Sequence, residues 1–398
     1  MKTTAIICEY NPFTYGHMRH LEKAREQTGA DTIICVMSGS FTQRGDAAIL
    51  DRYQRAELAA RLGADMVVEL PLVYAISPAE NFAYGALKTV SALPFVEYLS
   101  FGSECGDVNL LEKAADLSEN EPEEFKQILA SYLADGNNYP KAYSNALDDY
   151  AEKNPEYADM KGILGAPNNC LGICYIKAAK KLGLNIKFHT VKRENNDNDS
   201  ELNGEYPSAS AIRRALRREQ FDEVKKYVHP YCYNYLKQIK SDGLALNDLC
   251  LFKMKSISGY DLENYYDMDV AGGLHNRLKL AAAESVTFDE FLEKAKTKKY
   301  TMARIKRICL YTLFDVTRNV YEEAVKCPPH VYVLALNKLR KDILTELNKS
   351  CENVLIRYSD INKVDRSLRF LIKLDFRAQG TLNLINRSQC FGKSLLLV

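Results

Sequence analysis

The sequence lacks the features that mark several classes of protein. No apolar run approaches the roughly 18–20 residues that span a bilayer, which excludes a transmembrane protein. The eleven cysteines include no C-x-x-C pair, and this disfavours zinc ribbons and thioredoxin-like redox sites. The chain begins Met1-Lys2-Thr3-Thr4 without a signal-peptide pattern, and it contains no internal repeat or low-complexity tract. We therefore expect a cytoplasmic protein with reduced thiols and no membrane partner.

The charge is unevenly distributed along the chain. Hydrophobic residues make up 46% and charged residues 26% of the 398 positions, as in globular proteins of two or three domains. Residues 1–225 contain 25 basic and 33 acidic residues, whereas residues 226–398 contain 28 basic and 19 acidic residues. A basic half within a nearly neutral chain favours a domain that approaches a polyanion.

Short apolar runs alternate with helix-like segments in residues 1–225. The runs rich in Ile, Val and Phe are Thr4–Cys8, Thr32–Met37, Met66–Leu70, Val96–Phe101 and Asn185–Thr190. Continuous runs of this kind are typical of strands buried on both faces of a parallel sheet. Helices are expected near 16–28, 51–62, 80–92 and 168–182. The alternation predicts an α/β fold with a doubly wound parallel sheet.

Other parts of the chain break this rhythm. The polar, acidic stretch at about 107–160 is expected to form a helical insertion. Residues 226–398 are expected to form a basic, mostly helical domain, with one long helix over Thr301–Ala324. Within that domain, Val354–Ile356 and the short runs at 370–376 are expected to form a small sheet.

The stretch after the first strand carries the strongest chemical signal. It reads Cys8-Glu9-Tyr10-Asn11-Pro12-Phe13-Thr14-Tyr15-Gly16-His17-Met18-Arg19-His20-Leu21. Gly16 lets the backbone approach a ligand closely. His17 falls in the first turn of the following helix, where free N–H groups and the helix dipole favour phosphate. Its imidazole can donate a hydrogen bond to phosphoryl oxygens as negative charge develops on them.

A second motif, Ser208-Ala209-Ser210-Ala211-Ile212-Arg213, has the pattern of a helix start. Its serines can cap the helix, and Arg213 can reach a polyphosphate. Taken alone, the serines would be interpreted as helix caps, whereas the pairing with the first motif favours a role in binding phosphate.

The two motifs resemble those of the HxGH-type nucleotidylyltransferase superfamily, in which T-x-G-H or H-x-G-H lies in the first βα loop and binds ATP phosphates. Four further stretches resemble the bacterial tRNA(Met) cytidine acetate ligase family: Met37–Gly45, Phe101–Glu104, Pro167–Ile173 and Val191–Arg193. The resemblance implies a nucleotidyltransferase-like Rossmann domain at 1–225 that binds ATP, and a domain at 226–398 that binds tRNA.

The resemblance also implies an activity. In that family ATP and acetate form acetyl-adenylate and pyrophosphate, and the acetyl group then passes to N4 of the wobble cytidine of elongator tRNA(Met). Mg²⁺ is expected to accompany ATP, although the sequence identifies no metal ligands. The base that assists the attack of N4, the acetate pocket, the anticodon-reading residues and the oligomeric state cannot be read from the sequence.

Site residues follow from the same resemblance. The expected catalytic residues are His17 and Arg213. The expected ATP-binding residues are Ile7, Cys8, Glu9, Tyr10, Asn11, Pro12, Phe13, Thr14, Tyr15, Gly16, His17, Met18, Arg19, His20, Gly102, Asn169, Arg193, Ser208 and Ser210. The expected tRNA-binding residues are Arg44, Lys192, Arg304, Lys306 and Arg307.

Two other interpretations remain open. One is a nucleotidylyltransferase that adenylylates a small phosphorylated cofactor precursor, which the basic C-terminal half disfavours. The other is a non-catalytic RNA-binding protein, which the presence of both phosphate motifs disfavours. The isolated histidines His189, His229, His275 and His330 are interpreted as structural or surface residues.

Overall fold

The computed structural model describes residues 1–193, 201–202, 204–239, 244–388 and 393–398. At its centre is a sheet with the strand order β5-β4-β1-β2-β3-β6-β7, and β8 pairs with β6. The strands are β1 (Thr3–Cys8), β2 (Thr32–Ser38), β3 (Met66–Leu70), β4 (Val96–Ser103), β5 (Lys187–Lys192), β6 (Val331–Leu336), β7 (Val354–Leu355) and β8 (Leu396–Leu397). The first five strands are parallel, so the expected doubly wound sheet is confirmed.

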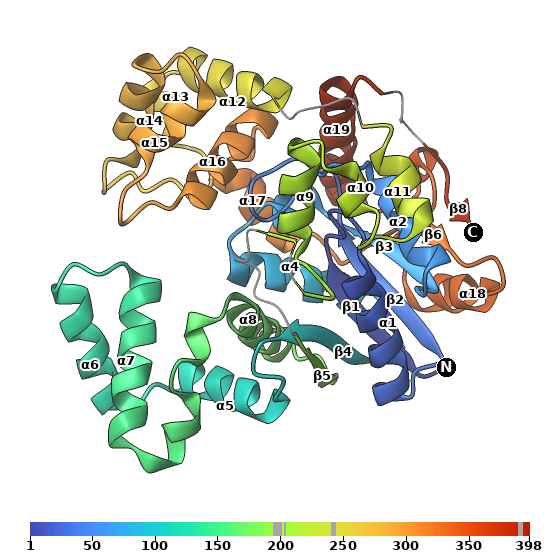
Figure 1. Ribbon diagram of the computed structural model, residues 1–398, viewed down its shortest axis with the longest axis horizontal. Coiled ribbons are helices and arrows are strands. Elements are labelled where there is room, and N and C mark those ends of the chain that lie inside the picture. The colour runs from blue at the N-terminus through green and yellow to red at the C-terminus, as the bar shows by residue number, and fades with distance from the viewer. Residues whose placement is uncertain (194–200, 203, 240–243, 389–392) are drawn as a thin grey trace.

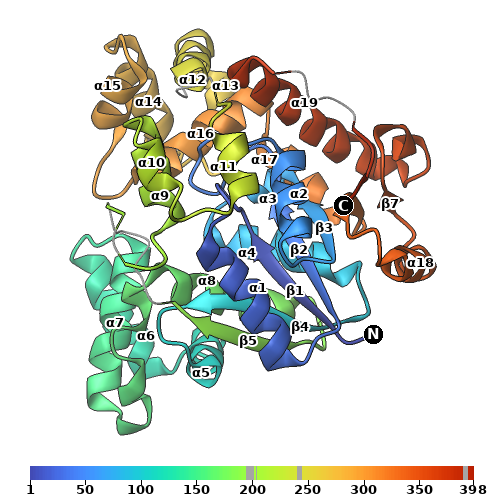
Figure 2. The ribbon, with the colours of Figure 1, turned by 45° about the vertical axis from the view of Figure 1, so that its right-hand side comes forward.

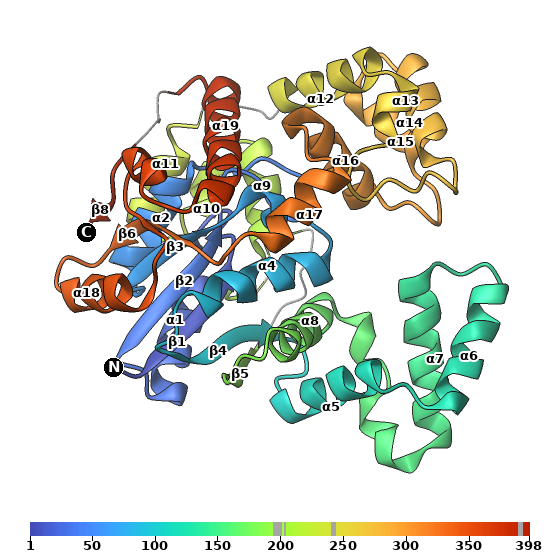
Figure 3. The same ribbon diagram turned by 180° about the vertical axis from the view of Figure 1, so that it is seen from behind.

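Helices cover both faces of this sheet (Figures 1 and 3). Helices α1 (Tyr15–Thr28) and α2 (Arg52–Arg61) pack on one face, and α4 (Ala79–Ser91) and α8 (Pro167–Lys181) pack on the other. Strands β2 and β3 are buried at every position, as their continuous apolar sequence predicts. The strand order reverses between β1 and β4, and sheets of this kind bind ligands at the carboxyl ends of such strands.

The remaining helices follow in chain order. The short α3 (Leu72–Ala75) lies between β3 and α4, and the acidic stretch forms an arm of three helices beside α8 (Figure 1): α5 (Val108–Glu119), α6 (Glu123–Ala134) and α7 (Tyr139–Lys153). The chain then continues through α9 (Ala209–Arg217), α10 (Phe221–Val224) and α11 (Pro230–Leu236). Figure 2 shows these three helices above α1.

A cluster of helices follows, in which α12 packs against α14, α15 and α16. It comprises α12 (Leu244–Ser256), α13 (Gly259–Leu262), α14 (Leu274–Ala283), α15 (Phe288–Ala295) and α16 (Met302–Phe314). The chain returns to the sheet through α17 (Arg318–Lys326), and α18 (Lys341–Ser350) and α19 (Arg369–Asn386) complete it. Every helix of the described ranges is too short or too polar to cross a membrane.

Strand β6 is the main structural feature that the sequence analysis missed. It pairs antiparallel with β3, with Met66 opposite Leu336 and Val67 opposite Ala335. Residues 331–336 are all buried, and their continuous apolar run resembles that of the earlier strands. The sheet therefore takes a strand from beyond residue 225, where a boundary between domains is expected.

Two local expectations were wrong. Residues 370–376 lie inside α19, where Leu371, Leu374, Ala378 and Leu382 are buried at helical spacing rather than in a strand. The single helix expected over 301–324 is divided, because Asp315 adopts a left-handed conformation with φ 55° and ends α16. Residues 354–355 do form a short strand, as expected.

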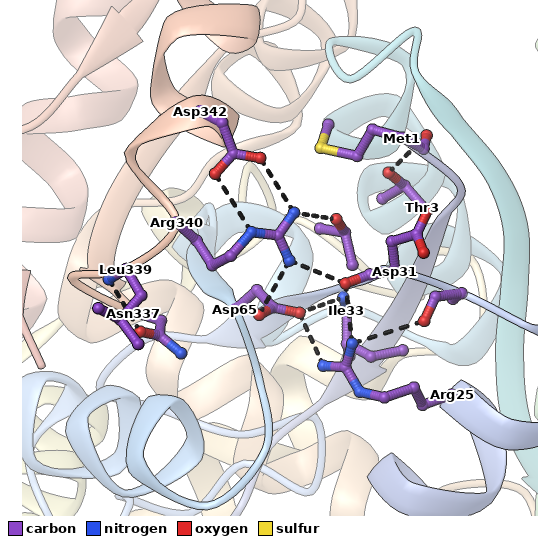
Figure 4. Close-up of polar contacts among 12 residues, drawn as sticks. Met1, Thr3, Arg25, Asp31, Ile33, Asp65, Asn337, Leu339, Arg340 and Asp342 are labelled. Atoms are coloured by element: carbon purple, nitrogen blue, oxygen red, sulfur yellow. Dashed lines mark hydrogen bonds and ion pairs between the residues drawn. The ribbon is translucent and has the colours of Figure 1, made fainter.

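A polar network holds the amino ends of the strands together (Figure 4). Asp65 pairs with Arg25 at 2.7 Å and with Arg340 at 3.3 Å. Arg340 also donates a hydrogen bond to Thr32 Oγ1 at 2.7 Å and pairs with Asp342 at 3.1 Å. Because Arg340 immediately precedes α18, the network ties the last part of the chain to the start of β2. It lies at the end of the sheet opposite the carboxyl ends of the strands.

Candidate nucleotide-binding site

A pocket opens at the carboxyl ends of β1 and β4, where the strand order reverses. Its walls come from the start of α1, the ends of β4 and β5, and the segment that leads into α9. The lining residues are Thr14, Gly16, His17, Arg19, His20, Gly102, Val191, Lys192, Arg193, Tyr206, Pro207, Ser208 and Ala209. The fold thus brings parts of both motifs together with Gly102, from the stretch Phe101–Glu104, and with the stretch Val191–Arg193.

Two helices begin at this pocket. Thr14 caps α1 by accepting a hydrogen bond from the backbone N–H of His17, and Ser208 caps α9 by accepting one from Ala211 at 3.1 Å. Free N–H groups at helix N-termini attract anions, and Arg19, Lys192 and Arg193 add positive charge to the same lining. Since the lining has no Asp or Glu among the described residues, the site favours a polyanion.

The capping interaction also fixes the ring of His17. The backbone N–H of Thr14 donates to Nδ1 of His17 at 3.1 Å. The rings of Tyr10 and Phe13 pack against the imidazole with centroids 5.0 and 5.8 Å away. Because Nδ1 accepts a hydrogen bond, the neutral ring carries its hydrogen on Nε2. In this tautomer His17 is a hydrogen-bond donor at Nε2.

The first half of the β1–α1 loop does not line the pocket, and instead supports the residues that do. Tyr10 is in the left-handed conformation with φ 47°, and Arg55 donates to the carbonyl oxygen of Glu9 at 2.6 Å. The Glu9 carboxylate accepts a hydrogen bond from the backbone N–H of Gln43, although burial raises its pKa. Seven residues expected to bind ATP lie at the end of β1 or in this half of the loop, outside the pocket lining: Ile7, Cys8, Glu9, Tyr10, Asn11, Pro12 and Phe13. Tyr15 and Met18, on α1, also lie outside the pocket lining.

Gly102 serves a packing purpose at the end of β4. A Cβ atom at this position would lie 3.2 Å from Cγ of Arg193 and 3.3 Å from its Cδ. The missing side chain therefore leaves room for the Arg193 stem beside β4, and both residues line the pocket. Contact of Gly102 with ATP remains a prediction.

Burial keeps His20 neutral. Burial is the main cause that lowers the pKa of this histidine to about 3, and nearby His17, His189 and Arg193 contribute to the same shift. Neutral His20 acts in the pocket through hydrogen bonds and not through charge. Burial also lowers the pKa of Arg213, but a guanidinium remains cationic at any physiological pH.

Asn169, Ser210 and Arg213 also lie outside the pocket lining. Asn169 is buried, and its Oδ1 accepts hydrogen bonds from the backbone N–H groups of Glu104 and Cys105 at 3.0 and 3.1 Å. It therefore orders the turn after β4. Arg213 donates from Nη2 to Oγ of Ser210 at 3.0 Å. Contact of these residues with ATP remains a prediction.

The residues expected to bind tRNA are divided between two places. Lys192 lines the pocket, and Arg44 lies 3.5 Å from Oγ of Ser210. Those of α16 make contacts within the chain: Arg304 pairs with Asp267 at 3.1 Å, Lys306 pairs with Asp46 at 2.9 Å, and Arg307 donates to the carbonyl oxygen of Gln43 at 3.3 Å. Their role toward tRNA remains a prediction, and in this structure they hold α16 against neighbouring segments.

Sequence analysis missed Tyr206 as a lining residue. Its ring lies 5.0 Å from the guanidinium of Arg19, and its Cβ is 3.5 Å from where a side chain on Gly16 would begin. Tyr206 thus lines the pocket beside the first turns of α1. The only sequence signal was its place two residues before Ser208.

The described residues contain no group of three or more His, Cys, Asp or Glu side chains arranged to hold a metal ion. The cysteines of the described chain are all free thiols. A doubly wound sheet with two helix N-termini and several cations at its switch point defines a nucleotide-binding α/β protein.

Comparisons with known proteins identify the family. A family model described as HIGH Nucleotidyl Transferase matches residues 1–394. The tRNA(Met) cytidine acetate ligase of Clostridium perfringens (strain SM101 / Type A) is 36% identical over 403 residues, which cover 100% of this chain and 98% of that protein. The protein of the same name from Thermoanaerobacter sp. (strain X514) is 37% identical over 354 residues, which cover 88% of this chain and 86% of that protein.

Solved structures agree with this result. The crystal structure of Thermotoga maritima TmcAL in its apo form I matches with a TM-score of 0.91 at 30% identity, covering 100% of both chains. The structure of the same protein bound with alpha-thio ATP matches with a TM-score of 0.88. The chain therefore belongs to the HIGH nucleotidyl transferase family and, within it, to the tRNA(Met) cytidine acetate ligases. The resemblance inferred from the motifs is confirmed.

Proposed function

We propose that this protein is an ATP-dependent ligase that converts acetate into acetyl-adenylate and transfers the acetyl group to N4 of the wobble cytidine of elongator tRNA(Met). The observation that carries this proposal is the pocket at the switch point, where two helix N-termini and three cationic side chains meet without a carboxylate among the described lining residues. The ATP analogue bound to the T. maritima relative supports ATP as the nucleotide.

In the first step, the acetate carboxylate attacks the α-phosphorus of ATP and pyrophosphate leaves. This reaction depends on positioning and on neutralising charge rather than on an acid–base pair. Arg19, Lys192 and Arg193 supply positive charge, and the N–H groups at the start of α1 and α9 supply hydrogen-bond donors. His17 adds a donor for an oxygen on which charge develops.

In the second step, N4 of cytidine attacks the acetyl carbon, the bond from that carbon to the phosphate oxygen breaks, and AMP leaves. The amine loses a proton in the process. Orientation of the two reactants supplies much of the required rate, because a cytidine amine is a poor nucleophile.

We assign Mg²⁺ to the phosphates of ATP and not to protein ligands. The described lining offers no carboxylate, and Mg²⁺ is commonly held by substrate phosphates and water. We also place the reaction in the cytoplasm, because its substrates are tRNA and ATP and the described cysteines are free thiols.

Exchange of labelled pyrophosphate into ATP, without tRNA, tests the first step. We expect exchange that requires acetate and that falls by at least about 100-fold in His17→Ala. Absence of acetate-dependent exchange, both without tRNA and with it, would refute the ligase proposal. Exchange restored by adding tRNA would show instead that activation is coupled to binding of the acceptor.

Mass spectrometry of tRNA tests the second step. Incubation with ATP, acetate and an elongator tRNA(Met) transcript should yield N4-acetylcytidine at the wobble position. A transcript with uridine at that position should remain unmodified and serves as the control. Acetylation elsewhere in the tRNA would contradict the proposed acceptor.

A further inference from the structure

A chain of hydrogen bonds leads from the pocket to the surface through three elements. Nε2 of His20 lies 3.0 Å from Oγ of Ser100, and the same Oγ lies 3.0 Å from Nδ1 of His189. Nε2 of His189 lies 2.8 Å from the side-chain oxygen of Gln27. His20 and Gln27 are seven residues apart on α1, and Ser100 and His189 are directly paired across β4 and β5. We call these four residues the His20 relay.

In this structure the Gln27 side chain turns its oxygen, and not its NH2 group, toward Nε2 of His189, and this orientation fixes the hydrogens along the relay. The Gln27 oxygen can only accept, so Nε2 of His189 carries a hydrogen and donates it. A neutral imidazole has one N–H, which leaves Nδ1 of His189 as an acceptor for the Ser100 hydroxyl. Having donated its hydrogen, Oγ of Ser100 accepts from Nε2 of His20.

As a result, Nδ1 of His20 carries no hydrogen and is a hydrogen-bond acceptor. This ring lines the pocket with Nε2 turned toward the sheet, and within the described residues Nδ1 makes no hydrogen bond. Burial lowers the pKa of both relay histidines, so each ring stays neutral near pH 7. His17 and His20, one helical turn apart, therefore offer opposite partners, since His17 has an N–H donor and His20 a lone pair.

A lone pair repels phosphate oxygens, which are themselves acceptors. Ionised ATP has hydrogen-bond donors only on its nucleoside part, namely the two ribose hydroxyls and the adenine N6 amine. We propose that His20 determines specificity in the ATP site by accepting a hydrogen bond from one of these nucleoside donors, with Ser100, His189 and Gln27 as positioning residues that fix its tautomer. This proposal rests on the proposed use of ATP.

Nitrogen NMR of the full chain labelled in its six histidines tests the tautomer directly. At pH 7.5 we expect His20 to carry its hydrogen on Nε2. Ser100→Ala should shift His20 to a mixture of tautomers, and so should His189→Ala, although His189 lies outside the pocket lining. A wild-type His20 with its hydrogen on Nδ1, or a tautomer that neither variant changes, would overturn the proposal.

Calorimetric titration with ATP tests the consequence for binding. Ser100→Ala should weaken ATP binding about fivefold. Ser285→Ala, which removes an equally buried hydroxyl bonded to the carbonyl oxygen of Ala281, is the matched control and should leave it unchanged. Equal weakening in both variants would show a general effect of burial and overturn the proposal.

Three analogues identify the donor: 2′-deoxy-ATP, 3′-deoxy-ATP and purine riboside triphosphate, which lacks the N6 amine. One of them should bind wild type about fivefold more weakly than ATP, and that loss should disappear in Ser100→Ala. If every analogue loses the same factor in both proteins, His20 accepts from none of the donors. Failure of the wild-type chain to bind ATP would instead refute the proposed function, independently of the tautomer result.

Discussion

Arg213 donates a hydrogen bond to the carbonyl oxygen of Asn11 at 2.6 Å, across 202 positions of sequence. Its second terminal nitrogen donates to Oγ of Ser210 at 3.0 Å. One guanidinium thus joins the start of α9 to the loop that leads into α1, whose first turn carries His17. In this structure Arg213 acts on the site by fixing the spacing between two helix N-termini, and no part of it lines the pocket.

Arg213→Lys tests this positioning role. A single ammonium cannot reproduce the planar fork that bonds to both oxygens, so the loop and α9 lose their fixed spacing. We expect the KM for ATP in pyrophosphate exchange to rise roughly tenfold with a smaller change in kcat. Arg217→Lys, at an exposed position of the same helix, is the control. A fall in kcat above 100-fold at unchanged KM would show that Arg213 acts on the reacting phosphates.

Gly45→Ala tests how α16 is held to the rest of the protein. Gly45 has φ +80°, and a Cβ there would lie 2.6 Å from Cβ of Lys306 and 2.9 Å from the backbone nitrogen of Arg307. Gly136 has the same φ, but no atom lies within 4 Å of a Cβ placed there, so Gly136→Ala measures the cost of the left-handed backbone alone. We expect the free energy of unfolding to fall by about 3 kcal/mol for Gly45→Ala and about 1 kcal/mol for Gly136→Ala.

Urea denaturation measures both variants. Equal losses would mean that α16 moves away at little cost, and that the contacts of Lys306 and Arg307 with residues 43–46 contribute little to stability. In that case the two side chains would be available to tRNA, as the sequence analysis expects.

Arg340→Ala tests the network at the amino ends of the strands. The substitution removes bonds to Asp65 and Thr32, which lie in or beside a buried part of the sheet. We expect a loss of about 2 kcal/mol in the free energy of unfolding and no change in the Kd for ATP, because the pocket lies at the other end of the strands. Asp342→Ala removes only the exposed partner and should cost less than about 0.5 kcal/mol. An altered Kd for ATP in Arg340→Ala would contradict this separation.

The pH dependence of stability provides another test. Burial lowers the pKa of His330 to about 4, and nearby Lys88 contributes. The unfolded chain takes up a proton near pH 6.5 and the native chain does not, so the free energy of unfolding falls as the pH drops below about 6.5. Between pH 7.5 and 5.5 this histidine should account for about 1 kcal/mol. The loss over that interval should be smaller by this amount in His330→Gln, and an unchanged loss would mean that native His330 is protonated.

Local signals in the sequence predicted the parallel part of the sheet and the loop around His17. The first five strands are continuous apolar runs. A strand that is buried on both faces can be recognised from its own run, without knowing which strand it pairs with. The Thr14-Tyr15-Gly16-His17 motif was informative because capping, dipole and ring chemistry all act within one helical turn.

Features that depend on distant partners were missed. Strand β6 has an apolar run as clear as that of β3, but only the folded chain shows that the two pair antiparallel. Lys306 was expected to bind tRNA, and only the folded chain places Asp46, 260 positions away, beside it. His189 appeared to be an isolated histidine, because its partners Ser100 and Gln27 are separated from it by 89 and 162 positions.

The antiparallel pairing of β6 with β3 also affects how the protein is made. The ribosome releases β3 roughly 260 residues before β6, an interval of tens of seconds at ordinary rates of translation. The last pocket-lining residue, Ala209, emerges about halfway through that interval. Until β6 arrives, the outer side of β3 presents unpaired backbone groups, and an open strand of this kind is a template for pairing with other chains. A nascent chain stalled between residues 210 and 330 is therefore expected to carry all pocket-lining residues and to aggregate through β3.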